Sequence, residues 1–179
     1  MKDDDLLKLC NRCLDYNHQT GIITWVEMIS KFSNKLVGQE AGCYTRGYKT
    51  LRINGINHLA HRIAFLMHHG FMPLSIDHIN GIKDDNRSVN LRECTIKENN
   101  RNCGVRENNS TGYKGVHKLS NKRLTTDKWV VMIGSDDGPK YKGIFTTPEL
   151  AAQAYDKAAL EYHGEFALTN KSMGLINEL

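Results

Sequence analysis

Few cysteines, few prolines and no long apolar run characterise this chain of 179 residues. No stretch approaches the roughly 18 apolar residues that a membrane-spanning helix needs, so no membrane partner is expected. The acidic start, from Met1 to Asp5, lacks the pattern of a signal peptide. We therefore expect a cytoplasmic protein.

The five cysteines are odd in number and scattered, which argues against a disulfide framework. Cys10 and Cys13 have the spacing of half a zinc site, but no second pair completes it. Nothing in the spacing of His18 or Cys43 brings them into such a site. Structural zinc is therefore not expected, and ordinary buried or free thiols are.

The composition is that of a folded protein, with 40% hydrophobic and 25% charged residues. The net charge of +4 and the pI of about 8.8 make the chain mildly basic. This balance permits a nucleic-acid partner without requiring one.

The first part of the chain reads as β-rich. A short strand is expected over residues 21–25, and residues 48–53 alternate between apolar and polar. Asn54-Gly55 then gives a strong signal for a two-residue hairpin turn, after which the chain returns as another strand. A helix is expected over residues 61–69.

A strand–loop–strand–helix unit follows. We expect a strand over residues 76–79, a polar loop over 80–89 and a short strand over 90–92. Thr95 opens a helix, and Glu98 three residues later completes a capping box. This stretch is interpreted as a compact ββα unit.

Beyond residues 104–110, which have linker character, the pattern restarts. Three short strands are expected over residues 113–118, 128–133 and 140–145, followed by a helix that Thr147 caps. The predicted fold class is α+β. A β-rich region leads into the ββα unit, and a small three-stranded antiparallel sheet packed on one helix follows.

Asp77 and His78 are the first candidates for chemistry. Hydrolysis of a phosphodiester needs a group that deprotonates water, and a His suits this because its pKa lies near the operating pH. A hard cation such as Mg²⁺ takes oxygen ligands, which Asp77 and Asn99 can supply. Adjacent strand residues point to opposite faces, so Asp77 and His78 need a twisted strand end to share one site. On composition alone, a structural role for the pair is the more common outcome.

Around this pair the chain carries Ile76-Asp77-His78-Ile79-Asn80-Gly81, Asp85-Asn86-Arg87, Asn90-Leu91-Arg92 and Glu98-Asn99-Asn100-Arg101-Asn102, preceded by His61-Arg62-Ile63-Ala64 and Gly70-Phe71-Met72-Pro73. Asn90 and Asn99 follow His78 by 12 and 21 residues. The whole pattern, over roughly residues 20–103, closely resembles the HNH endonuclease family. More narrowly, it resembles the phage and intron-associated branch in which Asn replaces the last His.

The resemblance implies a metal-dependent DNA endonuclease in which Asp77 and Asn99 bind one divalent ion, Mg²⁺ or Mn²⁺. It further implies that His78 is the general base and that Asn90 orients it across the hairpin loop. Arg92 or Arg87 is a candidate phosphate contact.

Two structural interpretations stay open beside these roles. An Asn at the position of Asn90 is also a common brace of a hairpin loop. His61 begins the expected helix and is interpreted as a packing or capping residue.

Positive charge is concentrated on the expected second sheet. Residues 113–145 hold seven Lys/Arg against three Asp/Glu, whereas residues 148–164 hold one Lys against three acids. We expect the helix to cover one face of this sheet and the other face to be basic and aromatic, as suits a reader of a DNA groove. Solubility alone would also account for the lysines.

This part of the chain carries Gly112-Tyr113-Lys114-Gly115-Val116, Lys128-Trp129-Val130-Val131-Met132-Ile133, Gly143-Ile144-Phe145 and the runs from Glu149 to Ala159 and from Gly164 to Asn170. Over about residues 110–170 it resembles the Apetala-two/ethylene-response-factor DNA-binding domain, whose sheet enters the major groove. The matching contact positions are Lys114, His117, Lys118, Trp129 and Tyr141, with Tyr155 as a further one. Lysine lacks the bidentate fork of arginine, so we expect more phosphate contact and less base specificity. Trp129 can also be interpreted as a core residue.

The predicted organisation is a nuclease domain over residues 1–104 with its ββα-metal core at about 74–103, a linker over 105–111, a DNA-binding domain over 112–171 and a tail over 172–179. The predicted function is that of a homing-type DNA endonuclease or nickase. We expect it to act as a monomer on double-stranded DNA, in the bacterial host cytoplasm if it is phage-encoded. The alternative is a non-catalytic, sequence-specific DNA-binding regulator with an inactive nuclease fold. A nuclease directed at RNA also stays open.

Overall fold

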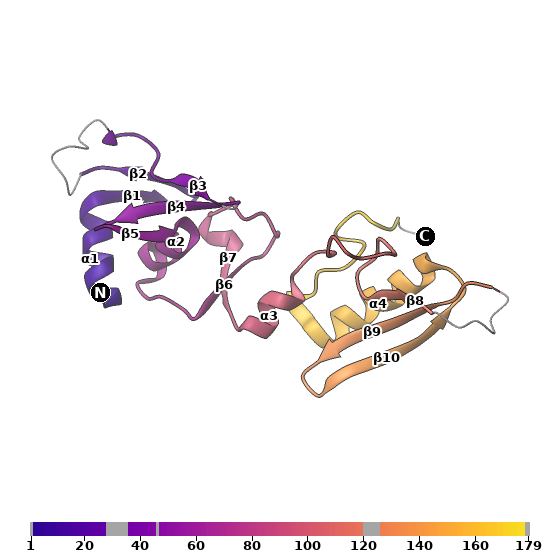
Figure 1. Cartoon of the computed structure of the whole chain (residues 1–179). Coiled ribbons are helices and arrows are strands. Elements are labelled where there is room, and N and C mark those ends of the chain that lie inside the picture. Colours follow the sequence, from indigo (N-terminus) through magenta and orange to yellow (C-terminus); the bar gives the residue numbers. More distant parts are fainter. Residues whose placement is uncertain (1, 28–35, 46, 120–125, 178–179) are drawn as a thin grey trace. The chain divides into compact units, whose positions relative to one another are not determined.

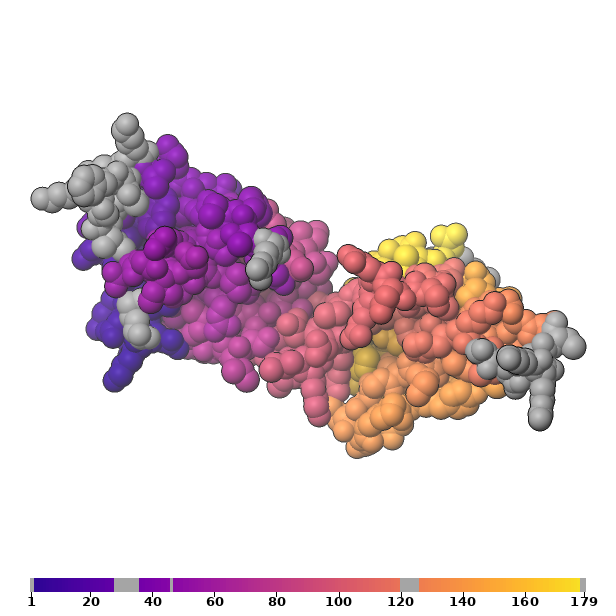
Figure 2. Space-filling model, in the orientation of Figure 1, coloured from indigo at the N-terminus to yellow at the C-terminus, as the bar shows by residue number. Residues whose placement is uncertain are grey.

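The computed structural model describes residues 2–27, 36–45, 47–119 and 126–177. It divides into two compact units, Met1–Ile96 and Lys97–Leu179, whose placement relative to one another is not determined (Figure 1). Each unit packs around its own apolar core. Figure 2 shows the atoms of both units coloured by residue number, as in Figure 1. Lys122 and Arg123, part of the basic stretch of the sequence, lie outside the described residues.

A helix opens the first unit, within a region that the sequence predicted to be β-rich. Helix α1 (Asp3–Cys13) has its acidic residues in the first turn, where the helix dipole favours negative charge. Leu6, Cys10 and Cys13 recur at helical spacing and are buried. The expectation of a β-rich start was therefore wrong for these residues, because the acidic run is the beginning of an amphipathic helix.

Two small antiparallel sheets follow α1. A two-stranded hairpin comes first, and a three-stranded sheet in the order β3-β4-β5 comes next. Their strands are β1 (Leu14–Asn17), β2 (Ile22–Trp25), β3 (Cys43–Thr45), β4 (Tyr48–Ile53) and β5 (Ile56–Leu59). The predicted turn between β4 and β5 is confirmed: Asn54 and Gly55 both have positive φ, 48° and 79°, as a type I′ turn requires.

Helix α2 (Ala60–His69) follows β5 and buries most of its apolar side chains in the core of the first unit. It ends at Gly70, whose left-handed backbone lets its N–H bond the Leu66 carbonyl. A second hairpin then pairs β6 (Ser75–His78) with β7 (Leu91–Cys94). The 3₁₀ turn η2 (Ser88–Asn90) leads directly into β7.

The second unit contains a three-stranded antiparallel sheet with one long helix against it, as predicted. Its sheet has the order β10-β9-β8, and the core lies between this sheet and α4. The elements are α3 (Ile96–Arg101), β8 (Val116–Lys118), β9 (Trp129–Ser135), β10 (Gly138–Phe145), α4 (Pro148–His163) and η3 (Gly164–Phe166). Thr147 caps α4 by accepting a hydrogen bond from the Leu150 N–H.

The open face of this sheet differs from the basic face that the sequence predicted. Met132, Tyr141 and Ile144 lie on it with 46%, 58% and 55% of their surface exposed. Lys142 instead folds toward α4, where its ammonium lies 2.7 Å from the Tyr162 hydroxyl. Among the described residues the open face is therefore apolar and aromatic where a basic face was expected, because strand alternation sends Lys142 toward the helix side.

The fold is mixed α and β with small antiparallel sheets, which agrees with the predicted α+β class. Within the described part of the chain, no helix combines the length and the apolarity that crossing a membrane requires.

Candidate active site

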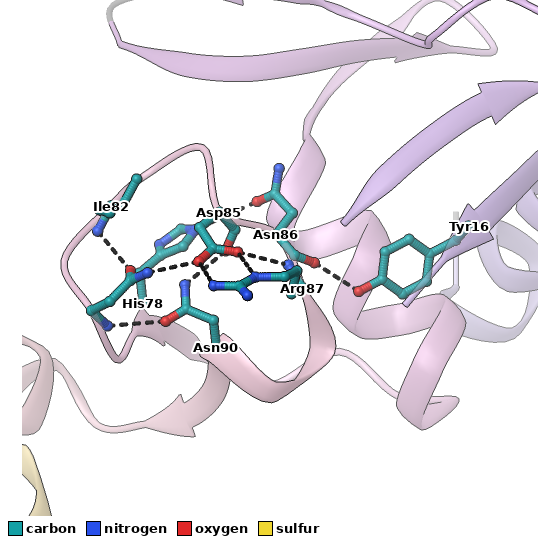
Figure 3. Close-up of polar contacts among 8 residues, drawn as sticks. Tyr16, His78, Ile82, Asp85, Asn86, Arg87 and Asn90 are labelled. Carbon is teal, nitrogen blue, oxygen red and sulfur yellow. Dashed lines mark hydrogen bonds and ion pairs between the residues drawn. The ribbon is translucent and has the colours of Figure 1, made fainter. Parts of the chain in front are cut away.

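The loop between β6 and β7 folds back over the end of β6 and encloses a group of polar side chains (Figure 3). Asp77, His78, Asn86 and Asn90 are all buried, with 3–8% of their surface exposed. Buried polar groups need hydrogen-bond partners, so the contacts within this loop determine how each side chain is held.

His78 is the last residue of β6, and its Nε2 lies 3.4 Å from Oδ1 of Asn86. Burial lowers the pKa of His78, against smaller raising effects from the Asn86 hydrogen bond and from the nearby carboxylates, Asp77 first. Because the lowering effect is the larger, the imidazole is neutral at neutral pH. Since the Asn86 oxygen can only accept, Nε2 carries the proton and Nδ1 keeps its lone pair.

Asn90 braces the loop by two hydrogen bonds to the main chain. Its Oδ1 accepts from the Asn80 N–H at 3.0 Å, and its Nδ2 donates to the Asp85 carbonyl at 2.7 Å. These bonds tie together the two sides of the loop that leads from His78 to Asn86 (Figure 3). The sequence left open whether Asn90 orients His78 or braces the loop, and its side-chain bonds are those of a brace.

Both arginines of the predicted site are paired with carboxylates. Arg92 lies opposite Asp77 in the β6–β7 register and donates to its Oδ2 from Nε at 2.9 Å and from Nη2 at 2.8 Å. Arg87 donates to Asp85 from Nε at 2.7 Å and from Nη2 at 2.5 Å. The Arg87 guanidinium lowers the pKa of Asp85 to about 2.

His61, at the start of α2, packs directly against His78. The two ring centroids lie 5.0 Å apart, edge to face, and the Tyr48 ring lies 5.7 Å away on another side. Burial, followed by the charges of His78 and Arg62, lowers the pKa of His61 to about 4. His61 is thus a packing residue, and the group it packs against is the predicted base.

The N-terminal hairpin supports the same loop from outside. The Tyr16 hydroxyl on β1 donates to the Asn86 carbonyl at 2.7 Å, and the Ser88 N–H donates to the His18 carbonyl at 3.0 Å. A Cβ on Gly21 would lie 2.6 Å from the main-chain nitrogen of Arg87, and the φ of Gly21 is +77°. Only glycine therefore lets the turn between β1 and β2 approach the loop this closely.

The remaining predicted ligand, Asn99, lies on α3, and all of α3 except its first residue belongs to the second unit. The first unit by itself brings together Asp77, His78, Asn90 and Arg92. Among the residues that the structure describes, no group of three or more His, Cys, Asp or Glu side chains is arranged to hold a metal ion.

The residues predicted to contact DNA in the second unit differ in their exposure and in where they lie on the sheet. His117 and Tyr141 are exposed on the open face of the sheet, and Lys118 is exposed at the end of β8. Trp129 shares a strand face with Val131 and packs partly into the core. Lys114 lies before β8, half-buried, and its ammonium donates to the Arg101 carbonyl at 2.6 Å.

Sequence reasoning assigned no role to Asn86 or Tyr16. Asn86 lies in a polar loop in which several side chains could point inward, and the sequence carries no signal that selects among them. Tyr16 lies in a strand that the sequence did not predict, about 70 residues before its partner.

Residues 58–101 match the model of a family described as HNH endonuclease. Neither the curated proteins nor the solved structures give any match to the chain. The matched stretch includes Asp77, His78 and the whole β6–β7 loop. It supports an HNH nuclease, a hydrolase that acts on DNA.

Proposed function

We propose that the chain is a metal-dependent DNA endonuclease or nickase of the homing type, with Asn in place of the last His of the HNH pattern. The observation that carries the proposal is His78: a buried, neutral imidazole, held by Asn86 next to Asp77, inside the stretch that matches the family. Such a group can take a proton from an attacking water at neutral pH.

The donor set suits a hard divalent cation. HNH nucleases generally use such an ion, and in this chain Asp77 and Asn99 would hold it through oxygen atoms. One carboxylate and one amide leave the other positions to waters, which is how Mg²⁺ or Mn²⁺ is commonly held. When bound, the ion neutralises charge on the phosphate and stabilises the leaving oxygen. Arg92 fixes the Asp77 carboxylate through Oδ2 and so sets the direction of the other oxygen.

The loop supplies orientation. Asn86 orients the His78 ring through its contact with Nε2. Asn90 keeps the loop closed and His61 limits the movement of the His78 ring. Arg92 and Arg87 are the proposed phosphate contacts; each would exchange part of its carboxylate pairing for a phosphate oxygen.

The second unit is proposed to grip double-stranded DNA, in the manner of an Apetala-two/ethylene-response-factor-like domain. Its three-stranded sheet with one packed helix supports this role, and so does the exposure of His117, Lys118 and Tyr141. Because the open face is largely apolar, we expect Tyr141 and its neighbours to contact bases and the lysines at the edges to contact phosphates.

The test is a supercoiled plasmid assay with Mg²⁺ or Mn²⁺, in which nicked and linear products separate. Wild-type protein is expected to cut, and EDTA is expected to stop it. His78→Ala should lower the rate by at least about 100-fold, because it removes the general base. His68→Ala, at an exposed histidine of α2, is the matched control and should cut normally.

Plasmids and phage genomic DNA that all stay intact would contradict the nuclease. Tight binding without cutting would favour the regulator instead. Cutting by His78→Ala at the wild-type rate would remove the assigned base.

A further inference from the structure

A pocket of about 380 Å³ lies within the second unit and has no role in the site described above. Its walls come from α3, from the segment before β8, from the end of β9 and from α4. The charged side chains that line it are all basic, namely Lys97, Arg101 and Lys114, and His163 lines it as well. A cavity with several cations and no lining carboxylate suits an anion.

The cations of this pocket differ in how they are paired. Arg101 donates to Asp136 at 2.5 Å, so its charge is partly offset. The Lys114 ammonium donates to the Arg101 carbonyl, a neutral acceptor, and Lys97 is exposed at the pocket. Lys97 and Lys114 therefore supply most of the positive charge of the pocket, and the charge of Asp156 offsets that of Lys114 in part.

His163 adds a buried polar atom without a partner. The residue has 8% of its surface exposed, and its Nε2 lies 2.6 Å from the Gly134 carbonyl, to which it donates. Among the described residues, Nδ1 of His163 has no hydrogen-bond partner. Burial lowers the pKa of His163, and the charges of Arg101 and Lys114 act in the same direction, against the Gly134 hydrogen bond and the charge of Asp136. Burial likewise lowers the pKa of Lys114 to about 8. The buried Lys114 cation thus lies where more negative charge would be stabilising.

The pocket is held in shape by its surroundings. Asn170, which is fully buried, accepts from the Lys114 N–H at 2.7 Å and donates to the Lys114 carbonyl at 3.2 Å. A Cβ on Gly115 would lie 1.9 Å from the Tyr155 ring, so the chain after Lys114 lies flat on a wall of the pocket. Lys114 is therefore presented from a fixed backbone, which lowers the entropic cost of binding.

We propose that this pocket binds a phosphodiester group of the DNA backbone, with Lys114 and Lys97 as its cations. The inference rests on the proposed function, which makes DNA the substrate. It assigns Lys114 to a phosphate in a pocket beside α3, away from the open face of the sheet. Such a contact adds affinity without sequence preference.

The test is the salt dependence of binding to a fluorescein-labelled DNA duplex of mixed sequence, measured by anisotropy in EDTA so that no cutting occurs. Lys114→Gln should weaken binding roughly fivefold at low salt. It should also reduce the slope of log affinity against log salt by about 1, because one phosphate contact is lost. Lys97→Gln should act in the same direction. Lys157→Gln, which removes the exposed lysine of α4, is the matched control and should leave the slope unchanged.

Equal slopes for Lys114→Gln, Lys97→Gln and Lys157→Gln would overturn the proposal, and so would wild-type protein that binds no duplex. If Lys114→Gln does not fold, Lys97→Gln decides alone. A free phosphate ion could occupy the same pocket, and a calorimetric titration with inorganic phosphate tests this alternative ligand. Saturable phosphate binding that Lys114→Gln abolishes, with unchanged DNA slopes, would assign the pocket to a free phosphate and overturn the DNA contact. Since the assay needs no cleavage, a failed nuclease test and a failed pocket test are distinguishable.

Discussion

Each unit buries a polar side chain in its interior, Asp156 in the second unit and His78 in the first, and the two are bonded differently. In the second unit, the buried Asp156 carboxylate accepts three N–H groups, from Asn170 N at 2.7 Å, Asn170 Nδ2 at 2.9 Å and Lys171 N at 2.8 Å. In the first unit, the bond that joins His78 to Asn86 is long, at 3.4 Å, and burial shifts the pKa of the histidine.

This difference in hydrogen bonding distinguishes a polar group with a structural role, Asp156, from one with a proposed catalytic role, His78. A carboxylate with three short bonds fixes the chain segments that donate to it. An imidazole next to carboxylates, with a long bond to Asn86, can gain and lose a proton, as proton transfer requires. Breaking each cluster should therefore have different consequences, in stability for one and in activity for the other.

The largest effect is expected from Asp156→Ala. It leaves three buried N–H groups without their acceptor, which should lower the free energy of unfolding of the second unit by about 4 kcal/mol. The chain has one tryptophan in each unit, Trp25 and Trp129, so urea unfolding can be followed by Trp129 fluorescence in a Trp25→Phe background. Asp137→Ala, at a carboxylate with 87% of its side chain exposed, is the control. A loss of under 1 kcal/mol would show that these bonds do not hold the unit.

His61 gives the next effect, and it depends on pH. The unfolded chain binds a proton at this histidine near pH 6.5, whereas in the folded unit the pKa is lowered to about 4. The unfolded state therefore binds more protons between these values. The contribution of His61 to the free energy of unfolding is fully present above pH 6.5. It is lost as the pH falls to 4, a decrease of about 3 kcal/mol.

His61→Phe should remove most of that pH dependence from the first unit. Unfolding curves between pH 4 and pH 7, followed by Trp25 fluorescence in a Trp129→Phe background, measure it. His68→Phe, at an exposed histidine of the same helix, should leave the pH dependence as it is. The same slope in wild type and His61→Phe would mean that His61 is protonated in the folded unit.

The smallest effect is expected from Asn86→Ala and should appear in catalysis alone. Without the Asn86 oxygen, the His78 ring is less well oriented, so kcat should fall about tenfold while KM stays unchanged. Asn86→Asp keeps an acceptor and should restore part of the rate. Asn57→Ala, at an exposed asparagine of β5, controls for the substitution itself. A fall in stability with an unchanged kcat would make Asn86 a structural residue only.

Local signals in the sequence predicted the elements whose cause is local. The turn at Asn54-Gly55 follows from residues that tolerate positive φ, and α4 follows from its cap, its proline and its small apolar face. Helix α1 was missed because its acidic first turn was interpreted as a chain start, although Leu6, Cys10 and Cys13 have helical spacing.

The site was predictable in its motif and not in its contacts. Asp77 and His78 were identified from residue type and spacing, and the matched family stretch contains both. The partnership of His78 with Asn86, and of Asn86 with Tyr16, depends on how a polar loop closes. Tertiary packing decides that closure, and no periodicity encodes it. The apolar character of the open face of the second sheet could not be predicted for a similar reason, because total lysine content does not say to which side each lysine points.

The glycine at position 21 sets a limit on how small a working nuclease fragment can be. The family match begins at residue 58, yet the loop that carries Asn86 is held from Tyr16, His18 and Gly21. A fragment cut to the matched stretch would keep every proposed ligand and the base, and would lose the backbone surface against which the loop closes. The minimal unit therefore reaches back to the first hairpin, and any side chain introduced at Gly21 should damage the site from outside the motif.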